Sequence, residues 1–464
     1  MLQSHIANDV IDHALASGAE FAELFIEHNI LAHVSTLNDQ VEAVRSGIDF
    51  GIGVRLLFGF EVFYGYTNSK QKKDLIDLVN QLTAIKILTK TNNIRPLIVV
   101  SPSTQSLHRL ASKPLSQGAY NSEKVLFLQQ ANQVAKQASQ LIKTTKGFVL
   151  QREQSVEIYN SEGLHASDTR HYARAGLTAI AVDKTQATGS WNTGGLVGWE
   201  LQDDLQADVM GGEASRQALV NIRAKPCPSG TMPVVIGSRF GGVIFHEACG
   251  HLLETTAVAK QASVFHDKMG QAIASSCVNA VDEGLTANAW GSITIDDEGM
   301  ATQRTQLIKD GILNQFLVDK VGALQTGYQR TGSGRRESYR YAPASRMRNT
   351  YIEAGSDTVE DMIASIDRGL YARHMGGGSV QPGTGEFNFA VTEGYYVEKG
   401  KIQYPVKAAT LISTGPKVLK SISMVGTDFN LACGMCGSVS GAVPTTVGQP
   451  TLKVDAILVG GNAK

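Results

Sequence analysis

The sequence predicts an α+β protein, with helices packed on a largely antiparallel sheet in its N-terminal domain and a β-rich, barrel-like C-terminal domain. Three observations support this fold class. Residues 20–66 alternate between apolar and polar side chains, helical periodicity follows further along the first half, and glycine density and strand patterns increase after residue 231. Regular strand–helix alternation is absent from the sequence, which disfavours a doubly wound parallel sheet.

The first half contains strand and helix patterns in a clear order. Short runs within residues 20–66 are separated by Asn-Asp, Ser-Gly and Gly-Phe turns, which predicts an antiparallel meander. Helical patterns follow at about 70–86 and 122–142, strand patterns at about 146–183, and another helical pattern at about 204–223.

A domain boundary is predicted near "AKPCPSG", residues 224–230, where prolines and a glycine precede a new apolar strand pattern. A chain of 464 residues exceeds the size at which one hydrophobic core stops growing. We therefore expect an N-terminal α+β domain of residues 1–228 and a C-terminal β-rich domain of residues 229–464.

The second half has helical patterns at 239–253 and 357–369, and its other segments look like strands. The clearest strand patterns are "SITIDDEG" (292–299), "QRTQLIKDGILNQFLV" (303–318), "FNFAVTEGYYVEKGKI" (387–402) and "PTLKVDAILVGG" (450–461).

Charge and composition narrow the classes of partner. With 42 basic and 43 acidic residues the net charge is −1, so no overall field favours nucleic acid or an anionic membrane. The first residues read as an amphipathic helix and not as a signal peptide, and no run approaches membrane-spanning length. We therefore expect a cytoplasmic protein.

The cysteines are sparse and odd in number, which argues against a disulfide framework and leaves metal or redox chemistry open. The five are Cys227, Cys249, Cys277, Cys433 and Cys436.

The stretch "RFGGVIFHEACGHLLE" (239–254) places His246 and His251 in an apolar helical run. Two isolated histidines in such a run are more commonly core residues, but neutral imidazoles bind zinc well and a catalytic zinc needs three protein ligands. Five residues of a regular helix turn through about 500°, which would leave the rings about 140° apart. A shared metal therefore predicts a deformed turn at residues 247–250. Glu247 would then lie beside the metal as a general acid/base.

A third ligand is available in the glycine-rich segment "LACGMCGSVSG" (431–441), where Cys436 and Cys433 are equally eligible by pattern. These two cysteines also form a C-x-x-C, a possible redox pair, but no following helix would lower a thiol pKa. Cys249 is a further alternative, as a nucleophile, although a thiol in an apolar run is more commonly inert. The spare imidazoles that could replace a ligand are His266 and His374.

Seven longer segments of the chain form a specific combination. They are "FHEACGHLLE" (245–254), "GSITIDDEG" (291–299), "TGSGRRESYRYAPASRMRNTYIEAG" (331–355), "GGGSVQPGTGEFNFAVTEGYYVEKGKI" (376–402), "KAATLISTG" (407–415), "SISMVGTDF" (421–429) and "VGQPTLKVD" (447–455). Together they resemble the TldD/PmbA family of metallopeptidases, and its TldD branch more than its PmbA (TldE) branch. PmbA-type relatives lack the histidine motif that this chain retains. The resemblance covers essentially the whole chain and is densest after residue 228.

The resemblance implies a zinc-dependent peptidase with His246, His251 and Cys436 as zinc ligands and Glu247 as the general acid/base. It also implies a homodimer, or a heterodimer with a PmbA (TldE)-type subunit, around a cavity that admits small or unfolded peptides. A peptide held extended as an added strand implies broad specificity. The alternative is a non-catalytic or conditionally active subunit of such a complex. The family's cysteine loop usually reads C-G-K-x-G-Q, whereas this chain reads "CGSVSG" and lacks that lysine and glutamine.

Arginines cluster in "GRRESYRYAPASRMR", residues 334–348. Arg335, Arg336 and Arg346 are candidates to bind a substrate carboxylate or to stabilise an oxyanion. The alternative is a solvated charge run whose partners are nearby acids such as Glu337 and Glu353.

Overall fold

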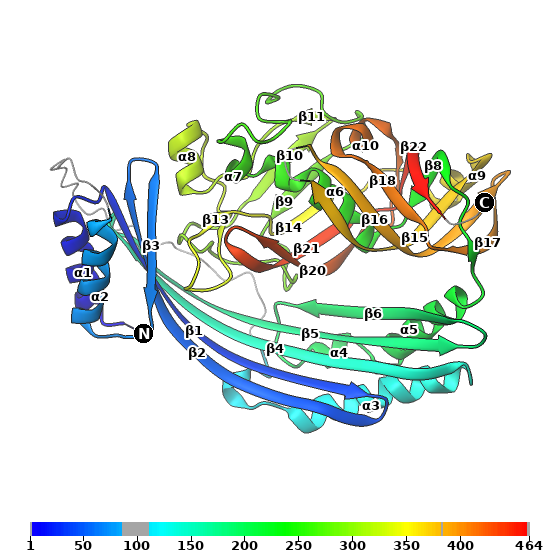
Figure 1. The fold of residues 1–464 in the computed structure, drawn as a ribbon, viewed down its shortest axis with the longest axis horizontal. Helices are drawn as coiled ribbons and strands as arrows, with labels where there is room; N and C mark the ends of the chain where they lie inside the picture. The colour runs from blue at the N-terminus through cyan, green and yellow to red at the C-terminus, as the bar shows by residue number, and fades with distance from the viewer. Residues whose placement is uncertain (1, 86–110, 382–383, 462–464) are drawn as a thin grey trace.

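A six-stranded antiparallel sheet dominates the N-terminal half of the computed structural model, which describes residues 2–85, 111–381 and 384–461 (Figure 1). Its strand order, β3-β2-β1-β4-β5-β6, confirms the predicted antiparallel meander. The strands are β1 (Phe21–Leu37), β2 (Gln40–Phe58), β3 (Glu61–Thr67), β4 (Ile142–Asn160), β5 (His165–Val182) and β6 (Gln186–Gly195).

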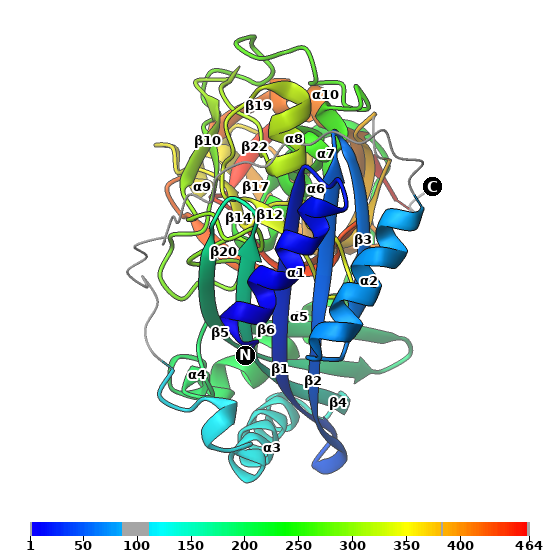
Figure 2. The ribbon, with the colours of Figure 1, turned by 90° about the vertical axis from the view of Figure 1, so that its left-hand side faces the viewer.

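The helices of this half lie where helical periodicity predicts them, although residue 86, the end of one predicted helix, lies outside the described residues. Two of them, α1 and α2, pack side by side on β1 and β3 (Figure 2), and α3 and α5 pack together at the other end of the sheet. The helices are α1 (Ser4–Ala16), α2 (Lys72–Ala84), α3 (Asn121–Ala138), α4 (Leu201–Asp204) and α5 (Ala207–Asn221), with a 3-10 turn, η1 (Leu115–Gln117).

Strand alternation gives the sheet two different faces. Along β1, the even-numbered residues Leu24, Ile26 and Val34 join the apolar cores beneath the helices. The odd-numbered Glu23 and Glu27 point to the opposite face, because successive side chains of a strand alternate. That second face meets the C-terminal half, which lies in the concavity of the curved sheet in Figure 1.

Five strands of the C-terminal half close into a barrel, which confirms the predicted barrel-like architecture. β15 pairs with both β8 and β16, and the ring closes through β22 and β18. The strands of this sheet are β7 (Lys225–Pro226), β8 (Gly230–Ile236), β15 (Arg368–Gln381), β16 (Glu386–Glu398), β17 (Lys401–Lys407), β18 (Thr410–Thr414), β19 (Ile422–Val425) and β22 (Leu452–Gly460).

A second six-stranded sheet, in the order β11-β10-β9-β14-β21-β20, lies beside the barrel. Its strands are β9 (Ala280–Glu283), β10 (Arg304–Lys309), β11 (Ile312–Leu313), β14 (Asn349–Ile352), β20 (Asn430–Ser438) and β21 (Gly441–Gln449). The remaining elements are η2 (Arg239–Gly242), α6 (Val243–Ala248), η3 (Gly250–Leu253), α7 (Thr255–Val258), α8 (Lys320–Thr326), β12 (Gly334–Arg335), β13 (Ala344–Ser345), α9 (Val359–Ala364) and α10 (Gly415–Ser421).

Two local predictions for this half are wrong. Residues 292–299 form no strand but an irregular loop in which Ile295 makes a single bridge to Ala301. Their alternating pattern arises because the acidic side chains of the loop are buried against arginines from other segments, as described below. The predicted helix at 357–369 ends at Ala364, because the chain enters β15 at Arg368. The location of a domain boundary at residues 228 and 229 stays a prediction.

The helix α6 lies between the barrel and the second sheet, in contact with strands of both. It is preceded by η2, which runs close to β21. A Cβ atom at Gly242 would lie 2.5 Å from the carbonyl oxygen of Gly448, so only glycine permits this approach. The side chains of α6 are consequently buried nearly all round, and His246 of this helix is buried beside the apolar core of the C-terminal half.

Candidate metal centre

The helix that carries His246 is short and deforms directly after Ala248. Cys249 has φ −132° and ψ −50°, and the chain then continues as the 3-10 turn η3. The predicted deformation at residues 247–250 is therefore confirmed, as a 3-10 continuation and not as a π turn. It brings the rings of His246 and His251 to a centroid separation of 5.2 Å.

The hairpin of β20 and β21 places Cys436 beside these histidines, although Cys436 lies 190 residues after His246 in the chain. Arg346 fixes the hairpin, because it donates hydrogen bonds to the carbonyl oxygens of Cys436 and Gly441 and to Ser440 Oγ. The cysteine is thus placed by the backbone of a strand end and by one buried guanidinium.

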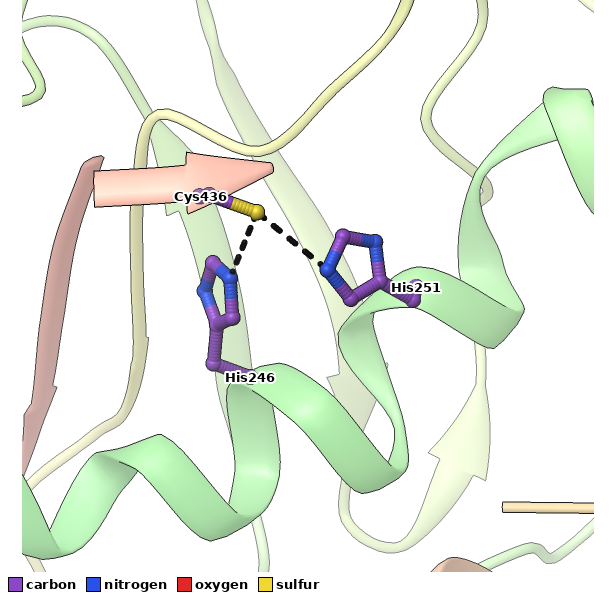
Figure 3. A group of neighbouring side chains, drawn as sticks. All are labelled: His246, His251 and Cys436. Atoms are coloured by element: carbon purple, nitrogen blue, oxygen red, sulfur yellow. Dashed lines mark hydrogen bonds between the residues drawn. The ribbon is translucent and has the colours of Figure 1, made fainter. Parts of the chain in front are cut away.

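Three donor atoms converge at this point (Figure 3). Cys436 Sγ lies 3.1 Å from His246 Nε2 and 3.2 Å from His251 Nε2. The three ligand atoms all lie within 4.8 Å of one another, and they form the one His/Cys/Asp/Glu group with such spacing in the described part of the chain. Two imidazole nitrogens and a thiolate are ligands that zinc prefers.

The charges within the cluster favour the thiolate form of the cysteine. Burial raises the pKa of the Cys436 thiol, but the charges and hydrogen bonds of the two histidines outweigh it and lower the pKa to about 3. Burial also lowers the pKa of His251, but Glu254 and Cys436 outweigh this effect and hold it well above 6.5. A thiolate is the form of cysteine that binds metal.

Glu254 is a residue of this site that the sequence reasoning missed. Its Oε2 lies 3.0 Å from His251 Nδ1, and its Oε1 accepts a hydrogen bond from the backbone N–H of Met347. A carboxylate on the far nitrogen of a ligand histidine fixes the orientation of the ring. The i,i+3 spacing from His251 was the available signal, since such residues share one face of a helical turn. His246 Nδ1 is buried without a hydrogen-bond partner among the described residues.

A cavity of about 710 Å³ opens beside the cluster and includes Glu247 in its wall. The Glu247 side chain is 29% exposed, and its Oε2 lies 3.7 Å from His251 Nε2. Val380 of β15 and residues 437–439, at the end of β20 and just after it, also line the cavity. The cavity has the size of a typical small-ligand site.

The other candidate cysteines and histidines lie elsewhere. Cys433 points to the other side of β20, where its Sγ donates a hydrogen bond to the carbonyl oxygen of Gly194. Burial raises the pKa of Cys433 to about 11 and also raises that of Cys249, which faces the apolar core. The two spare imidazoles, those of His266 and His374, lie outside the cluster.

The arginine-rich segment is largely buried, with Arg340 as its exposed arginine. Arg336 donates to Glu23 Oε1 of β1, and Arg335 donates to the backbone carbonyl of Met347. The guanidiniums of Arg335, Arg336 and Arg346 thus have partners within the protein. These partners are not Glu337 and Glu353, the nearby acids expected from the sequence. Substrate contact by Arg335, Arg336 and Arg346 stays a prediction.

Buried ion pairs join this arginine segment and the 292–299 loop to the N-terminal sheet. Glu298 accepts from Arg55 at 2.6 Å and from Arg330 at 2.9 Å. Glu23 in turn accepts from Arg55 at 2.6 Å and from Arg336 at 2.5 Å. We call these five residues the Glu298 cluster. Each of its two carboxylates meets two guanidiniums, so both carboxylates are paired within the protein.

Comparison with known proteins identifies family models and relatives that match this sequence. Models for three PmbA/TldA metallopeptidase domains match residues 22–86 (domain 1), 116–222 (central domain) and 229–461 (C-terminal domain). A protein of *Haemophilus influenzae* named metalloprotease TldD homolog is 38% identical, over 89% of this chain and 87% of its own. One of *Saccharolobus solfataricus*, named zinc metalloprotease TldD homolog, is 24% identical over 96% of this chain and 97% of its own.

The fold is also that of a solved structure. TldE from *Thermococcus kodakarensis* superimposes with a TM-score of 0.76 at 17% identity, and the match covers 98% of this chain and 100% of that one. Within residues 2–85, 111–381 and 384–461, no helix combines the length and apolar character needed to cross a bilayer.

Proposed function

The chain belongs to the PmbA/TldD metallopeptidase family, and from this premise we propose that it is a zinc-dependent peptidase whose metal is held by His246, His251 and Cys436. The observation that carries the proposal is the convergence of two imidazole nitrogens and one thiolate beside a cavity. The name of the *S. solfataricus* relative, a zinc metalloprotease, supports the choice of metal.

The residues present fit a zinc ion. Both Nε2 atoms point at the sulfur, Glu254 occupies the other nitrogen of His251, and the two histidines outweigh burial and favour the thiolate. Three protein ligands also leave a fourth coordination position, as a catalytic site requires. When bound, zinc supplies a Lewis acid that polarises a scissile carbonyl and makes water more acidic.

We assign Glu247 as the general acid/base. Its carboxylate lies in the cavity wall beside the coordinating nitrogen of His251, within reach of a water and of a peptide in the cavity. Glu247 takes a proton from the attacking water and passes it to the leaving amine. Glu254 holds His251 in the orientation that keeps its Nε2 directed at the metal position.

The substrate that suits this site is a short or unfolded peptide in extended conformation. β20 is a terminal strand of its sheet, and its exposed end at residues 437–438 lies in the cavity wall. Backbone groups there pair with an extended peptide without reading its side chains, which gives broad specificity. We further propose that a second subunit, either another copy or a TldE-type protein, encloses the cavity, in line with the fold shared with TldE.

The test is the substitution Glu247→Gln in the full-length protein, with Glu398→Gln, at an exposed strand end, as the matched control. We expect the zinc content to be unchanged and the cleavage of casein or a short peptide to fall by at least about 100-fold, since proton transfer contributes about 10²–10⁴-fold. Each protein is assayed alone and with a TldE-type partner. Turnover retained by Glu247→Gln contradicts the assigned role, and no turnover by the unsubstituted protein in either assay contradicts the peptidase.

A further inference from the structure

A second pocket, of about 340 Å³, lies where the N-terminal sheet faces the C-terminal half, and it shares no lining residue with the cavity beside Glu247. Its lining residues come from β5, β6 and α5 of the N-terminal half and from η2, β15, β16 and β20 of the C-terminal half. The residues that define its chemistry are Arg174, Trp191, Asn192, Arg239, His374 and Cys433.

Two guanidiniums converge on one residue in this pocket. Arg174 donates to Asn192 Oδ1 from Nε at 3.3 Å and from Nη2 at 2.8 Å. Arg239 donates from Nη2 to the backbone carbonyl of the same Asn192 at 3.2 Å and from Nε to that of Leu431 at 3.4 Å. Neither Nη1 group has a hydrogen-bond partner within the described chain, so each guanidinium keeps donors that a ligand can take.

The one carboxylate in the pocket lining, that of Glu213, acts on Arg239 through its charge but forms its ion pair with Arg216. Arg216 also binds Glu393, which Arg373 contacts as well. Cys433 is a neutral thiol, because burial raises its pKa to about 11. Among the described residues, no carboxylate lies within 4.0 Å of either Arg174 or Arg239 in an ion pair.

The buried arginines of the described chain have two kinds of partner. Arg335 and Arg346 have no carboxylate partner and donate to backbone carbonyls, as Arg174 and Arg239 also do in part. Arg55 and Arg170 each bind two carboxylates, and these partners outweigh burial and raise the pKa of both guanidiniums. For Arg174 and Arg239, burial instead lowers the pKa. Burial of an unpaired cation carries a cost, and an anion bound by these guanidiniums would offset it.

The backbone at Arg239 is also held in a conformation that a long side chain rarely adopts. Its φ is +69°, in the left-handed region, and its guanidinium carbon lies 3.8 Å from the centroid of the Trp191 ring. A non-glycine residue in this region is strained, and such strain gathers at ligand sites. Trp191 thus fixes the direction of one of the two guanidiniums.

We propose that this pocket binds a small oxyanion, the carboxylate or phosphate group of a ligand, between Arg174 and Arg239. Forked guanidinium donors match the two oxygens of either group. The pocket volume lies at the lower end of the range for small-molecule sites, so the ligand is a small molecule or the end of a chain. This site is separate from the metal centre and does not depend on the proposed peptidase activity.

The test is calorimetric titration of the full-length protein, at fixed ionic strength, with three probes: inorganic phosphate, triglycine and the C-terminal amide of triglycine. We expect phosphate, triglycine or both to bind and the amide to bind at least about tenfold more weakly than triglycine, because it lacks the carboxylate. Phosphate binding alone identifies a phosphate site, and triglycine binding alone identifies a carboxylate site. Either result supports the proposal.

Substitutions Arg174→Gln and Arg239→Gln, made separately, locate the binding. Each should weaken it by at least about tenfold, since each removes a charge-assisted pair of donors. Arg373→Gln is the matched control, because it removes a nearby charge outside the pocket wall. The unfolding midpoint of each variant in phosphate-free buffer shows that it is folded. The proposal is overturned if neither phosphate nor triglycine binds. It is also overturned if both pocket variants bind these probes as tightly as the parent protein does.

Discussion

Two clusters of buried ionisable side chains, the Glu298 cluster and the metal centre, are arranged in opposite ways. In the Glu298 cluster, each carboxylate meets two guanidiniums at 2.5 to 2.9 Å, so the side chains bind one another. In the metal centre, His246, His251 and Cys436 instead direct their donor atoms at one shared point beside a cavity. Burial of charged groups therefore does not by itself indicate a functional site, whereas convergence of several ligand atoms on one position does.

The largest stability effect expected from this comparison is that of Glu298→Gln. Removing the charge leaves Arg330 without its carboxylate and Arg55 with only Glu23, in a region where each side chain is buried or largely so. Breaking a buried ion pair typically costs about 3–5 kcal/mol. Urea unfolding measures this loss, and the zinc content of the folded variant should be unchanged. A loss below about 1 kcal/mol, the level of an exposed pair, contradicts the role assigned to the cluster.

The same cluster gives a pH dependence of stability with a defined sign. Burial raises the pKa of Glu298, but Arg55 and Arg330 outweigh it and lower the pKa below its usual value of 4.5. The stabilisation is therefore fully present above pH 4.5 and is lost as the pH falls below it. Urea unfolding between pH 7 and pH 3 should show this fall, and Glu298→Gln should flatten it. If the free energy of unfolding falls equally with pH in Glu298→Gln, other groups cause the pH dependence.

Glu254→Gln should instead weaken metal binding, which Glu298→Gln leaves unchanged. The amide oxygen can still accept the hydrogen bond from Met347 N–H, but the variant loses the negative charge beside His251. Loss of such a partner typically weakens metal affinity by about 10–100-fold. Competition for zinc against a chromophoric chelator measures the change. An unaltered affinity would show that packing alone orients the ring.

Arg340→Gln should have the smallest effect and serves as the baseline for both clusters. Arg340 pairs with Asp49 at 2.7 Å, but the two side chains are 43% and 33% exposed. Exposed pairs contribute less than about 1 kcal/mol. We expect urea unfolding and zinc affinity to match those of the parent protein. A loss of about 3 kcal/mol here would remove the contrast between matched buried charges and surface charges.

Local patterns were sufficient for the elements that are repetitive in sequence. The meander of residues 20–66 and the helix α3 followed from alternation and periodicity. The deformation after Ala248 followed from the angle between His246 and His251 on a helix. These features depend on neighbouring residues, so a single sequence contains the information.

Features that depend on distant partners were not accessible in this way. The acids of the 292–299 loop read as part of a strand because their partners, such as Arg55 and Arg170, lie more than 100 residues away. The choice between Cys433 and Cys436 needed the strand β20, since two residues an odd number of positions apart point to opposite faces. That strand was not predicted in the glycine-rich segment.

The most direct test of the account is zinc binding by two matched cysteine variants. The protein, Cys436→Ala and Cys433→Ala are each dialysed against zinc and analysed for metal content and oligomeric mass. The account predicts one zinc per chain in the parent protein and in Cys433→Ala, and its loss in Cys436→Ala, because only Cys436 Sγ lies beside both imidazoles. Zinc retained by Cys436→Ala, or lost equally by Cys433→Ala, would contradict it.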